Sequence, residues 1–217
     1  METMLWNLND ATTNLGDSAL LVPFAGGILV WLLLFHSWHA ARAWALAMAV
    51  AVGPIILLKF VFQTCDHALV DLRIVTPSGH ASFGLAVYGG LAMLIGREKG
   101  GWWGQAAWVV ATLIVTGICA TRLLMNVHSP AEVAIGLTVG IAALAVFRHE
   151  IAKAPARGDL RLAYAFVVFG AIGGVILGYM LYFDWGLPAD AVIRELAMTA
   201  GSHLLTCSSQ NAEFSAR

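Results

Sequence analysis

Six long apolar runs dominate the chain, at residues 18–35, 43–62, 81–96, 103–120, 131–147 and 162–183. A helix needs about 20 residues to cross the hydrocarbon of a bilayer, with a range of roughly 17–25. The third and fifth runs are short, but each becomes long enough if the polar residues before it begin the helix. The runs lack the two-residue alternation of barrel strands. Because only helices and closed barrels satisfy their backbone groups in lipid, we expect an all-α membrane protein, a six-transmembrane-helix bundle.

The composition agrees with a membrane protein and excludes some partners. Of the 217 residues, 59% are hydrophobic and 12% are charged, whereas an ordinary soluble domain has about 25% charged residues. The net charge is -1, so no positive electrostatic field favours the binding of nucleic acid. We expect membrane lipids to surround the protein. We expect one membrane domain over residues 1–183 and a tail over 184–217 that is partly amphipathic or disordered.

Basic residues predict the orientation of the bundle. The connections 36–42, 97–102 and 148–161 carry seven Lys or Arg residues, whereas 63–80 and 121–130 carry only Arg73 and Arg122. Loops rich in Lys and Arg stay in the cytoplasm. We therefore expect the second pair of connections to face outward, in a bacterial inner (plasma) membrane. His36 would then lie at the cytoplasmic interface.

Polar side chains gather at the ends of the runs that face outward. They are, in chain order, Lys59, then His67, Asp71 and Arg73 in the following loop, and then Ser78, His80, Arg122, His128 and Glu132. Lys59 alone is compatible with an anchor that reaches to the membrane surface. The convergence of cations, histidines and a carboxylate favours a functional site, because ionisable groups at membrane depth are costly.

These residue types are suited to phosphoryl chemistry. The planar fork of Arg122 matches phosphate, and Lys59 adds a point charge. Gly79 allows backbone to approach a ligand at the start of a helix, where N–H groups and the dipole favour an anion. A neutral imidazole attacks phosphorus, and an imidazolium protonates a leaving oxygen, so His80 and His128 together permit displacement with acid assistance.

The same stretches also have purely structural interpretations. In the segment 128–132, Ser129 fits a helix N-cap, Pro130 the first helical residue, and Glu132 the partner of a capping box. This interpretation is compatible with a second role for Glu132 beside His128. The residues Thr76 to Gly79 also fit a simple turn from a loop into a helix.

Two motifs resemble those of the type 2 phosphatidic acid phosphatase superfamily. The sequence PSGH at 77–80 is that family's second motif, and TRLLMNVHSPAE at 121–132 follows about 40 residues later. The family's third motif is Ser-Arg, five residues, His, three residues, Asp. Here Thr121 replaces the Ser and Glu132 replaces the Asp, while the spacing of Arg122, His128 and the acid is kept.

The first motif of that family departs from its pattern here. The pattern is Lys, six residues, then Arg-Pro, and Lys59 begins it correctly. Asp66 and His67 stand where the Arg-Pro is expected, so one phosphate-binding arginine is missing. Arg73 is the nearby cation that could take its place.

The resemblance implies a role for each matched residue. His128 is the nucleophile that forms a phosphohistidine, Glu132 orients it, and His80 protonates the leaving group. The implied phosphate-binding residues are Lys59, Ser78, Gly79, Arg122, Arg73 and, in support, Thr121. The resemblance implies no metal and no cofactor, and a lipid phosphate as substrate, such as phosphatidate or a polyprenyl pyrophosphate.

Two other functions stay open at this point. The altered first motif allows a catalytically degenerate member that binds or transports lipid phosphates without hydrolysis. A metal-dependent membrane enzyme would use Asp66, His67, His80 and His128, although their spacing resembles no zinc signature. No protein partner is identified.

Overall fold

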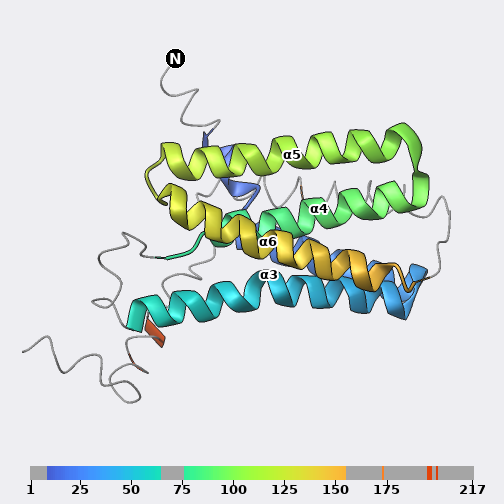
Figure 1. Cartoon of the computed structure of the whole chain (residues 1–217), viewed down its shortest axis with the longest axis horizontal. Coiled ribbons are helices and arrows are strands. Elements are labelled where there is room, and N and C mark those ends of the chain that lie inside the picture. The colour runs from blue at the N-terminus through green and yellow to red at the C-terminus, as the bar shows by residue number, and fades with distance from the viewer. Residues whose placement is uncertain (1–8, 65–75, 155–172, 174–194, 197–198, 200–217) are drawn as a thin grey trace, which may run out of the picture.

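The computed structural model describes residues 9–64, 76–154, 173, 195–196 and 199. After a short helix at residues 9–14, the described chain forms the following elements: α2 (Ser18–Trp31), the π-helix η1 (Leu32–His36), α3 (Trp38–Thr64), α4 (Gly79–Lys99), α5 (Gly101–Leu124) and α6 (Pro130–Ile151). Figure 1 shows α3, α4, α5 and α6 running side by side along the long axis.

Five helices within the described residues are long and apolar enough to cross a membrane. They correspond to the first five runs, with the first extended to Asn9–His36. Every element in the described residues is a helix, so the prediction of a helical integral membrane protein is confirmed there. The predicted sixth span, 162–183, lies outside the described residues except for Gly173, and the tail is described at three positions only.

The two short runs reach their full length through polar residues, as predicted. Ser78 is the N-cap of α4, which has 21 residues. Ser129 is the N-cap of α6, which has 22 residues and begins at Pro130. A Ser hydroxyl at this position accepts one of the backbone N–H groups that a helix leaves unpaired. Local cap chemistry thus sets where both helices begin.

Helix α4 lies in the middle of the bundle and contacts α3, α5 and α6. Gly136 of α6 is packed so tightly that an added Cβ would lie 2.4 Å from the carbonyl oxygen of Ser78. One turn on, a Cβ at Gly140 would lie 3.0 Å from both Leu85 and the Ser82 carbonyl. Small residues let membrane helices approach closely. This contact holds the starts of α4 and α6 together.

A buried tryptophan joins α2, α3 and α6 in the core. Trp44 of α3 donates a hydrogen bond from Nε1 to the Ala25 carbonyl of α2 at 3.0 Å. Its ring meets Phe147 edge-to-face, with centroids 5.7 Å apart. A Cβ at Gly90 would lie 2.8 Å from Trp44, so α4 also fits closely against this ring. The indole N–H is satisfied although it is buried, as such groups usually are.

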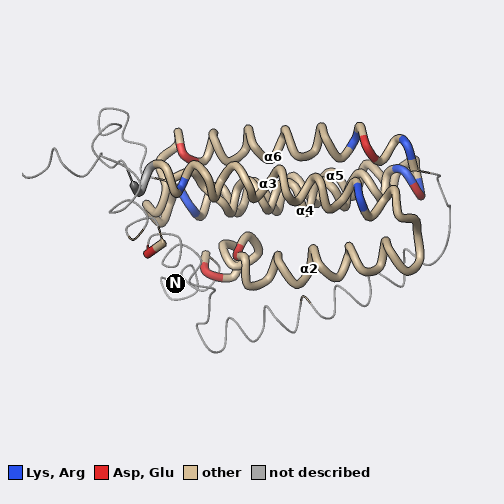
Figure 2. The backbone as a smooth tube through the Cα atoms, turned by 90° about the horizontal axis from the view of Figure 1, so that it is seen from below, with Lys and Arg blue, Asp and Glu red and all other residues tan. Residues whose placement is uncertain are grey.

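Charged residues are segregated to the two ends of the bundle, as Figure 2 shows. Arg122 in the last turn of α5 and Glu132 in the first turn of α6 lie at one end. Arg97 and Lys99 in the last turn of α4, and Arg148 in that of α6, lie at the other. The separation between the predicted site and the basic loops follows the sequence prediction.

His36 lies at the end of the first candidate span, and its side chain is directed into the bundle. Its ring is buried at the end of η1, with Nε2 3.1 Å from Oε1 of Glu98 in α4. Next to this contact, Arg97 donates a hydrogen bond to the Ala154 carbonyl. The wide turn of the π-helix places the histidine against α4 rather than outside, which the hydropathy pattern does not predict.

Candidate functional site

A backbone hydrogen bond links the start of α4 directly to the first turn of α6. Ser78 accepts a hydrogen bond from the Ala81 N–H at 3.4 Å, and Ser129 accepts one from the Glu132 N–H at 3.3 Å. The backbone N–H of Ser78 then donates to the Glu132 carbonyl at 3.1 Å. Two motifs far apart in the sequence therefore share one hydrogen-bonded corner of the bundle.

The Glu132 carboxylate contacts three nitrogen atoms at that corner. Its Oε1 accepts the backbone N–H of Thr76 at 2.7 Å, and its Oε2 accepts that of Ser129 at 2.8 Å. Oε2 also lies 3.2 Å from Nδ1 of His128. The capping box and the contact with the histidine are both present, so the structural and functional interpretations of Glu132 coexist. Glu132 is also the link from α6 to the Thr76–Ser78 segment.

The geometry around His128 favours a neutral ring with a defined tautomer. Its side chain is only 5% exposed, and a carboxylate at Nδ1 keeps the proton on that nitrogen and the lone pair on Nε2. Burial lowers the pKa of His128, the Glu132 hydrogen bond and charge oppose this, and the charges of Arg122 and Lys59 lower it further. An uncharged imidazole with a free Nε2 lone pair is a nucleophile.

The Arg122–His128 spacing corresponds to a tight reversal of the chain after α5. The Arg122 carbonyl accepts the backbone N–H groups of Val127 at 3.2 Å and His128 at 3.3 Å. Asn126 has φ 53° in this turn, in the left-handed region that Asn tolerates better than most residues. The turn returns the chain to the end of α5 and places the histidine beside the arginine.

Two cations from different helices act on the same histidine. Lys59 of α3 is only 6% exposed, although a lysine is rarely buried without a compensating interaction. Arg122 of α5 is half-buried, and its Nη1 donates to Oγ1 of Thr13 at 3.2 Å. Both charges lower the pKa of His128, so they lie within electrostatic range of it. The structure thus gathers Lys59, Arg122 and His128 at one end, as predicted.

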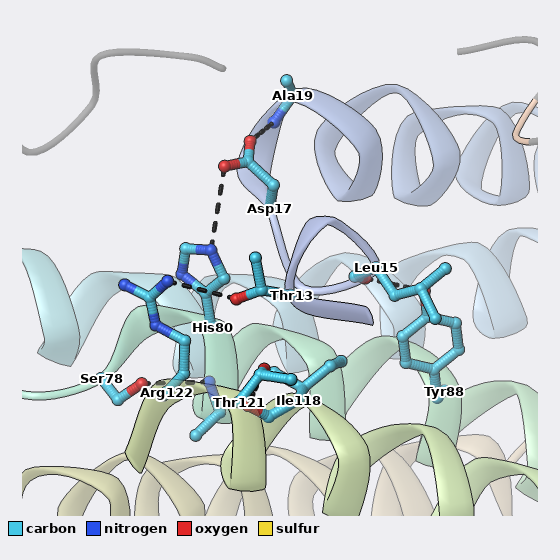
Figure 3. Close-up of polar contacts among 11 residues, drawn as sticks. Thr13, Leu15, Asp17, Ala19, Ser78, His80, Tyr88, Ile118, Thr121 and Arg122 are labelled. Atoms are coloured by element: carbon cyan, nitrogen blue, oxygen red, sulfur yellow. Dashed lines mark hydrogen bonds and ion pairs between the residues drawn. The ribbon is translucent and has the colours of Figure 1, made fainter. Parts of the chain in front are cut away.

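His80 lies in the first turn of α4 and faces the N-terminal segment. Its Nε2 is 3.8 Å from Oδ2 of Asp17, the residue that caps α2. On the same segment, the Leu15 carbonyl accepts the hydroxyl of Tyr88 at 2.8 Å. Figure 3 shows this segment lying over α4 and α5, with His80 and Arg122 both directed toward it.

The family comparison agrees with this arrangement. The model of the PAP2 superfamily matches residues 33–155, more than half of the chain, and covers Lys59, His80, Arg122, His128 and Glu132. The chain belongs to the PAP2 superfamily. A curated relative, the uncharacterized 22.5 kDa protein in the cps region of Klebsiella pneumoniae, is 22% identical over 187 residues, which are 86% of this chain and 88% of that protein. No solved structure matches the chain.

Membership of the PAP2 superfamily indicates phosphatase-type chemistry, which the site can perform. A nucleophilic imidazole, a carboxylate behind it and two cations beside it are the groups that phosphoryl transfer to a histidine requires. The second histidine, His80, lies at the start of the neighbouring helix and can carry a proton. The roles of these individual residues stay predictions.

Contacts within the PAP2 domain affect three of the predicted phosphate ligands to different degrees. The Ser78 hydroxyl accepts the Ala81 N–H as an N-cap, which leaves its own proton available. The Thr121 hydroxyl donates to the Ile118 carbonyl at 2.8 Å within α5, so its proton is already used. A Cβ at Gly79 would make only an ordinary contact, 3.7 Å from Ile55. Packing within the protein therefore leaves room for a side chain at Gly79.

Some predicted residues lie outside the described part of the chain. These are Arg73, Asp66 and His67, which follow α3. Conversely, sequence reasoning missed Thr13 and Asp17. The pattern Gly16-Asp17-Ser18 before an apolar run is a signal for a helix N-cap, but the sequence contains no signal that this cap faces His80.

Proposed function

We propose that the protein is an integral membrane phosphatase that hydrolyses a lipid phosphate or pyrophosphate through a phosphohistidine on His128. The observation that carries the proposal is the 3.2 Å contact between Nδ1 of His128 and Oε2 of Glu132. The charges of Arg122 and Lys59 act on the same histidine and lower its pKa. Phosphatase-type chemistry follows from PAP2 membership. The lipid substrate and the covalent intermediate are the additional content of the proposal.

In the first step, Nε2 of His128 attacks phosphorus and the bond from phosphorus to the leaving oxygen breaks. His80 gives a proton to that oxygen, so the product leaves as an alcohol or a lipid phosphate. Arg122, Lys59, the Ser78 hydroxyl and backbone N–H groups at the start of α4 hold the other phosphoryl oxygens. Glu132 stabilises the positive ring that forms on His128, as the acid of a Ser-His-Asp triad does.

In the second step, water attacks the phosphohistidine. Neutral His80 takes a proton from this water, the nitrogen–phosphorus bond breaks, and inorganic phosphate leaves. His80 is again protonated and His128 again neutral, so the cycle is complete without a metal or cofactor. The burial of His128 and its pKa, lowered by burial and by both cations, suit its role as a nucleophile that starts neutral.

The membrane setting favours a lipid substrate. The site lies at one end of helices that are apolar and long enough to cross the bilayer, where a phosphate head group can enter while its hydrocarbon stays in the membrane. Phosphatidate and polyprenyl pyrophosphates have this chemistry. The loop charges support an outward orientation of this end, and we propose a bacterial inner membrane as its location.

The test is hydrolysis of phosphatidate and a polyprenyl pyrophosphate by the purified full chain in detergent with EDTA. Wild type should release phosphate, and His128→Ala should lose at least about 10³-fold in kcat. His149→Ala is the matched control, because His149 is 75% exposed at the other end of the bundle. Equal rates for wild type and His128→Ala would exclude the mechanism, as would an acid-labile phosphoryl adduct on His80 instead of His128.

The altered first motif motivates a second candidate function. Asp66 and His67 replace the family's Arg-Pro, which removes one cation from the phosphate site. A protein that binds or transports lipid phosphates without hydrolysis would retain Arg122 and Lys59 yet show no turnover. Saturable binding of both lipids by wild type, with no phosphate released by either, would favour this candidate.

A further inference from the structure

The N-terminal segment contributes two polar contacts to the site from outside the matched PAP2 region. Thr13 accepts a hydrogen bond from Arg122 at 3.2 Å, and Asp17 lies 3.8 Å from Nε2 of His80. The family match begins at residue 33, so neither residue belongs to it. Both contacts join this segment to groups that the proposed reaction uses.

The two oxygens of Asp17 have different partners. Oδ1 accepts the Ala19 N–H at 2.7 Å and so caps α2. Oδ2 faces Nε2 of His80, and both side chains are about four-fifths buried. Because the cap bond fixes the carboxylate, its second oxygen is held in place toward the imidazole. A charge held in position near a partly buried ring interacts with it more strongly than an exposed, mobile one.

Tight packing keeps the His80 ring at this carboxylate. A Cβ at Gly16 would lie 3.1 Å from Cδ2 and 3.2 Å from Cβ of His80, and 2.8 Å from Ile118. Gly16 is therefore in close contact with the ring and with α5. The Tyr88–Leu15 hydrogen bond fastens the same segment one residue earlier.

We propose that Asp17 is a positioning residue for His80, orienting its ring and stabilising its protonated form for transfer to the leaving oxygen. This inference rests on the proposed function, in which His80 is the proton donor. Asp17 takes no part in the proton transfer itself. Nε2–H of His80 faces Asp17, and the Nδ1 proton passes to the leaving oxygen as the phosphorus–oxygen bond breaks. Nδ1 then takes a proton from the water that cleaves the phosphohistidine.

The other ionisable groups at this end contribute charges that affect the protonation of His80, and Asp17 must offset the cations among them. In the part of the chain that the structure describes, these groups include Lys59 from α3, Arg122 from α5, and the pair of His128 and Glu132 beside the start of α6. Figure 3 shows the His80 ring between the Asp17 carboxylate and the Arg122 guanidinium. Cations disfavour a protonated imidazole, and a nearby carboxylate favours it. Asp17 supplies that carboxylate, with its Oδ2 3.8 Å from Nε2 of His80.

The experiment compares Asp17→Asn with Asp17→Ala in the full chain in detergent. Asn caps helices as well as Asp does, so Asp17→Asn removes the charge and keeps the cap, whereas Asp17→Ala removes both. NMR of isotope-labelled histidine, with the His80 signal assigned by its loss in His80→Gln, follows the ionisation of the ring. In Asp17→Asn its titration midpoint should fall by about one pH unit, with thermal stability unchanged.

Kinetics separate proton donation from general damage. The loss in kcat/KM caused by Asp17→Asn should be about tenfold or more for a lipid phosphate, whose leaving group needs a proton. It should be much smaller for p-nitrophenyl phosphate, whose leaving group does not. Glu150→Gln, at the opposite end of the bundle, should change neither rate.

The outcomes distinguish this inference from the proposed function. An unchanged His80 midpoint in Asp17→Asn, or equal losses with both substrates, would overturn the role of Asp17 whatever the activity. If the His80 midpoint shifts in Asp17→Asn but the wild type hydrolyses neither substrate, the phosphatase proposal and the donor role are overturned. The charge coupling of Asp17 to His80 then still stands.

Discussion

The backbone N–H of His128 donates a hydrogen bond to the backbone carbonyl of Arg122, with nitrogen and oxygen 3.3 Å apart. The five residues between them therefore form a closed turn rather than a free loop. This turn determines how His128, the proposed nucleophile, and Arg122, the proposed phosphate ligand, lie relative to each other. The motif spacing thus has a geometric cause.

Replacement of Asn126 tests the importance of this turn. Its φ of 53° suits Asn and Gly but is strained for a β-branched residue. Asn126→Val should lower the free energy of unfolding by about 1–2 kcal/mol and reduce kcat/KM by displacing His128, whereas Asn126→Gly should retain most of the activity. Thermal unfolding and lipid-phosphate hydrolysis in detergent measure both effects. Equal behaviour of the Val and Gly variants would contradict the prediction.

Glu132 has a structural and a chemical role that two variants separate. Glu132→Gln keeps one carbonyl acceptor for the backbone donors but removes the charge behind His128, so kcat should fall by about 10²–10⁴-fold with a modest loss of stability. Glu132→Ala leaves the N–H groups of Thr76 and Ser129 without their acceptor, which should cost a further 1–3 kcal/mol or so. Denaturation midpoints that are the same for both variants would show that the side-chain bonds do not matter.

The lowered pKa of His128 predicts the acid side of the pH profile. Burial lowers this pKa first, and Arg122 and Lys59 lower it through their charges. The neutral nucleophile then persists below the ordinary histidine value of about 6.5, and activity is lost only as pH falls through the lowered pKa. Lys59→Met removes one charge, so the pKa should rise and the acid limb of kcat/KM should move to higher pH.

Ionisation of the substrate phosphate affects the pH profiles of wild type and Lys59→Met equally, because both enzymes act on the same substrate. A difference between the two acid limbs therefore reports on the enzyme. An acid limb that stays in place, or moves to lower pH, would show that the Lys59 charge does not reach His128.

Gly136 tests how close α4 and α6 must lie. A Cβ there would lie 2.4 Å from the Ser78 carbonyl, an atom of the α4 cap that cannot move aside alone. Gly136→Ala should therefore destabilise the bundle by about 1–3 kcal/mol and disturb the site. Gly26→Ala is the matched control, since nothing lies within 4 Å of a Cβ at that position. Similar melting temperatures for the two variants would refute the packing argument.

Much of the fold follows from local features of the sequence. The lengths of the apolar runs predicted five helices that the structure contains, and Ser78, Ser129 and Pro130 predicted where two of them begin. The contact of His36 does not follow from such local features. A π-turn rotates that side chain into the bundle beside Glu98, and no hydropathy pattern records such a rotation.

Some contacts of the candidate site also follow from local sequence, whereas others depend on how distant segments pack. Motif spacing placed Arg122, His128 and Glu132 together, because a turn and one helical turn relate them locally. The bond from Thr76 to Glu132 joins the segment before α4 to α6, and the approach of Asp17 to His80 joins the N-cap of α2 to α4.

By itself the sequence determined the membrane class, the helix starts and the residues of the PAP2 motifs, since these depend on hydrophobic length, cap chemistry and short spacings. Only the tertiary structure decided that Thr13 contacts Arg122, that Asp17 approaches His80, and that Glu132 joins α6 to the segment before α4. Such contacts arise from how the helices pack, and the close approach at Gly136 is a property of that packing rather than of any single segment.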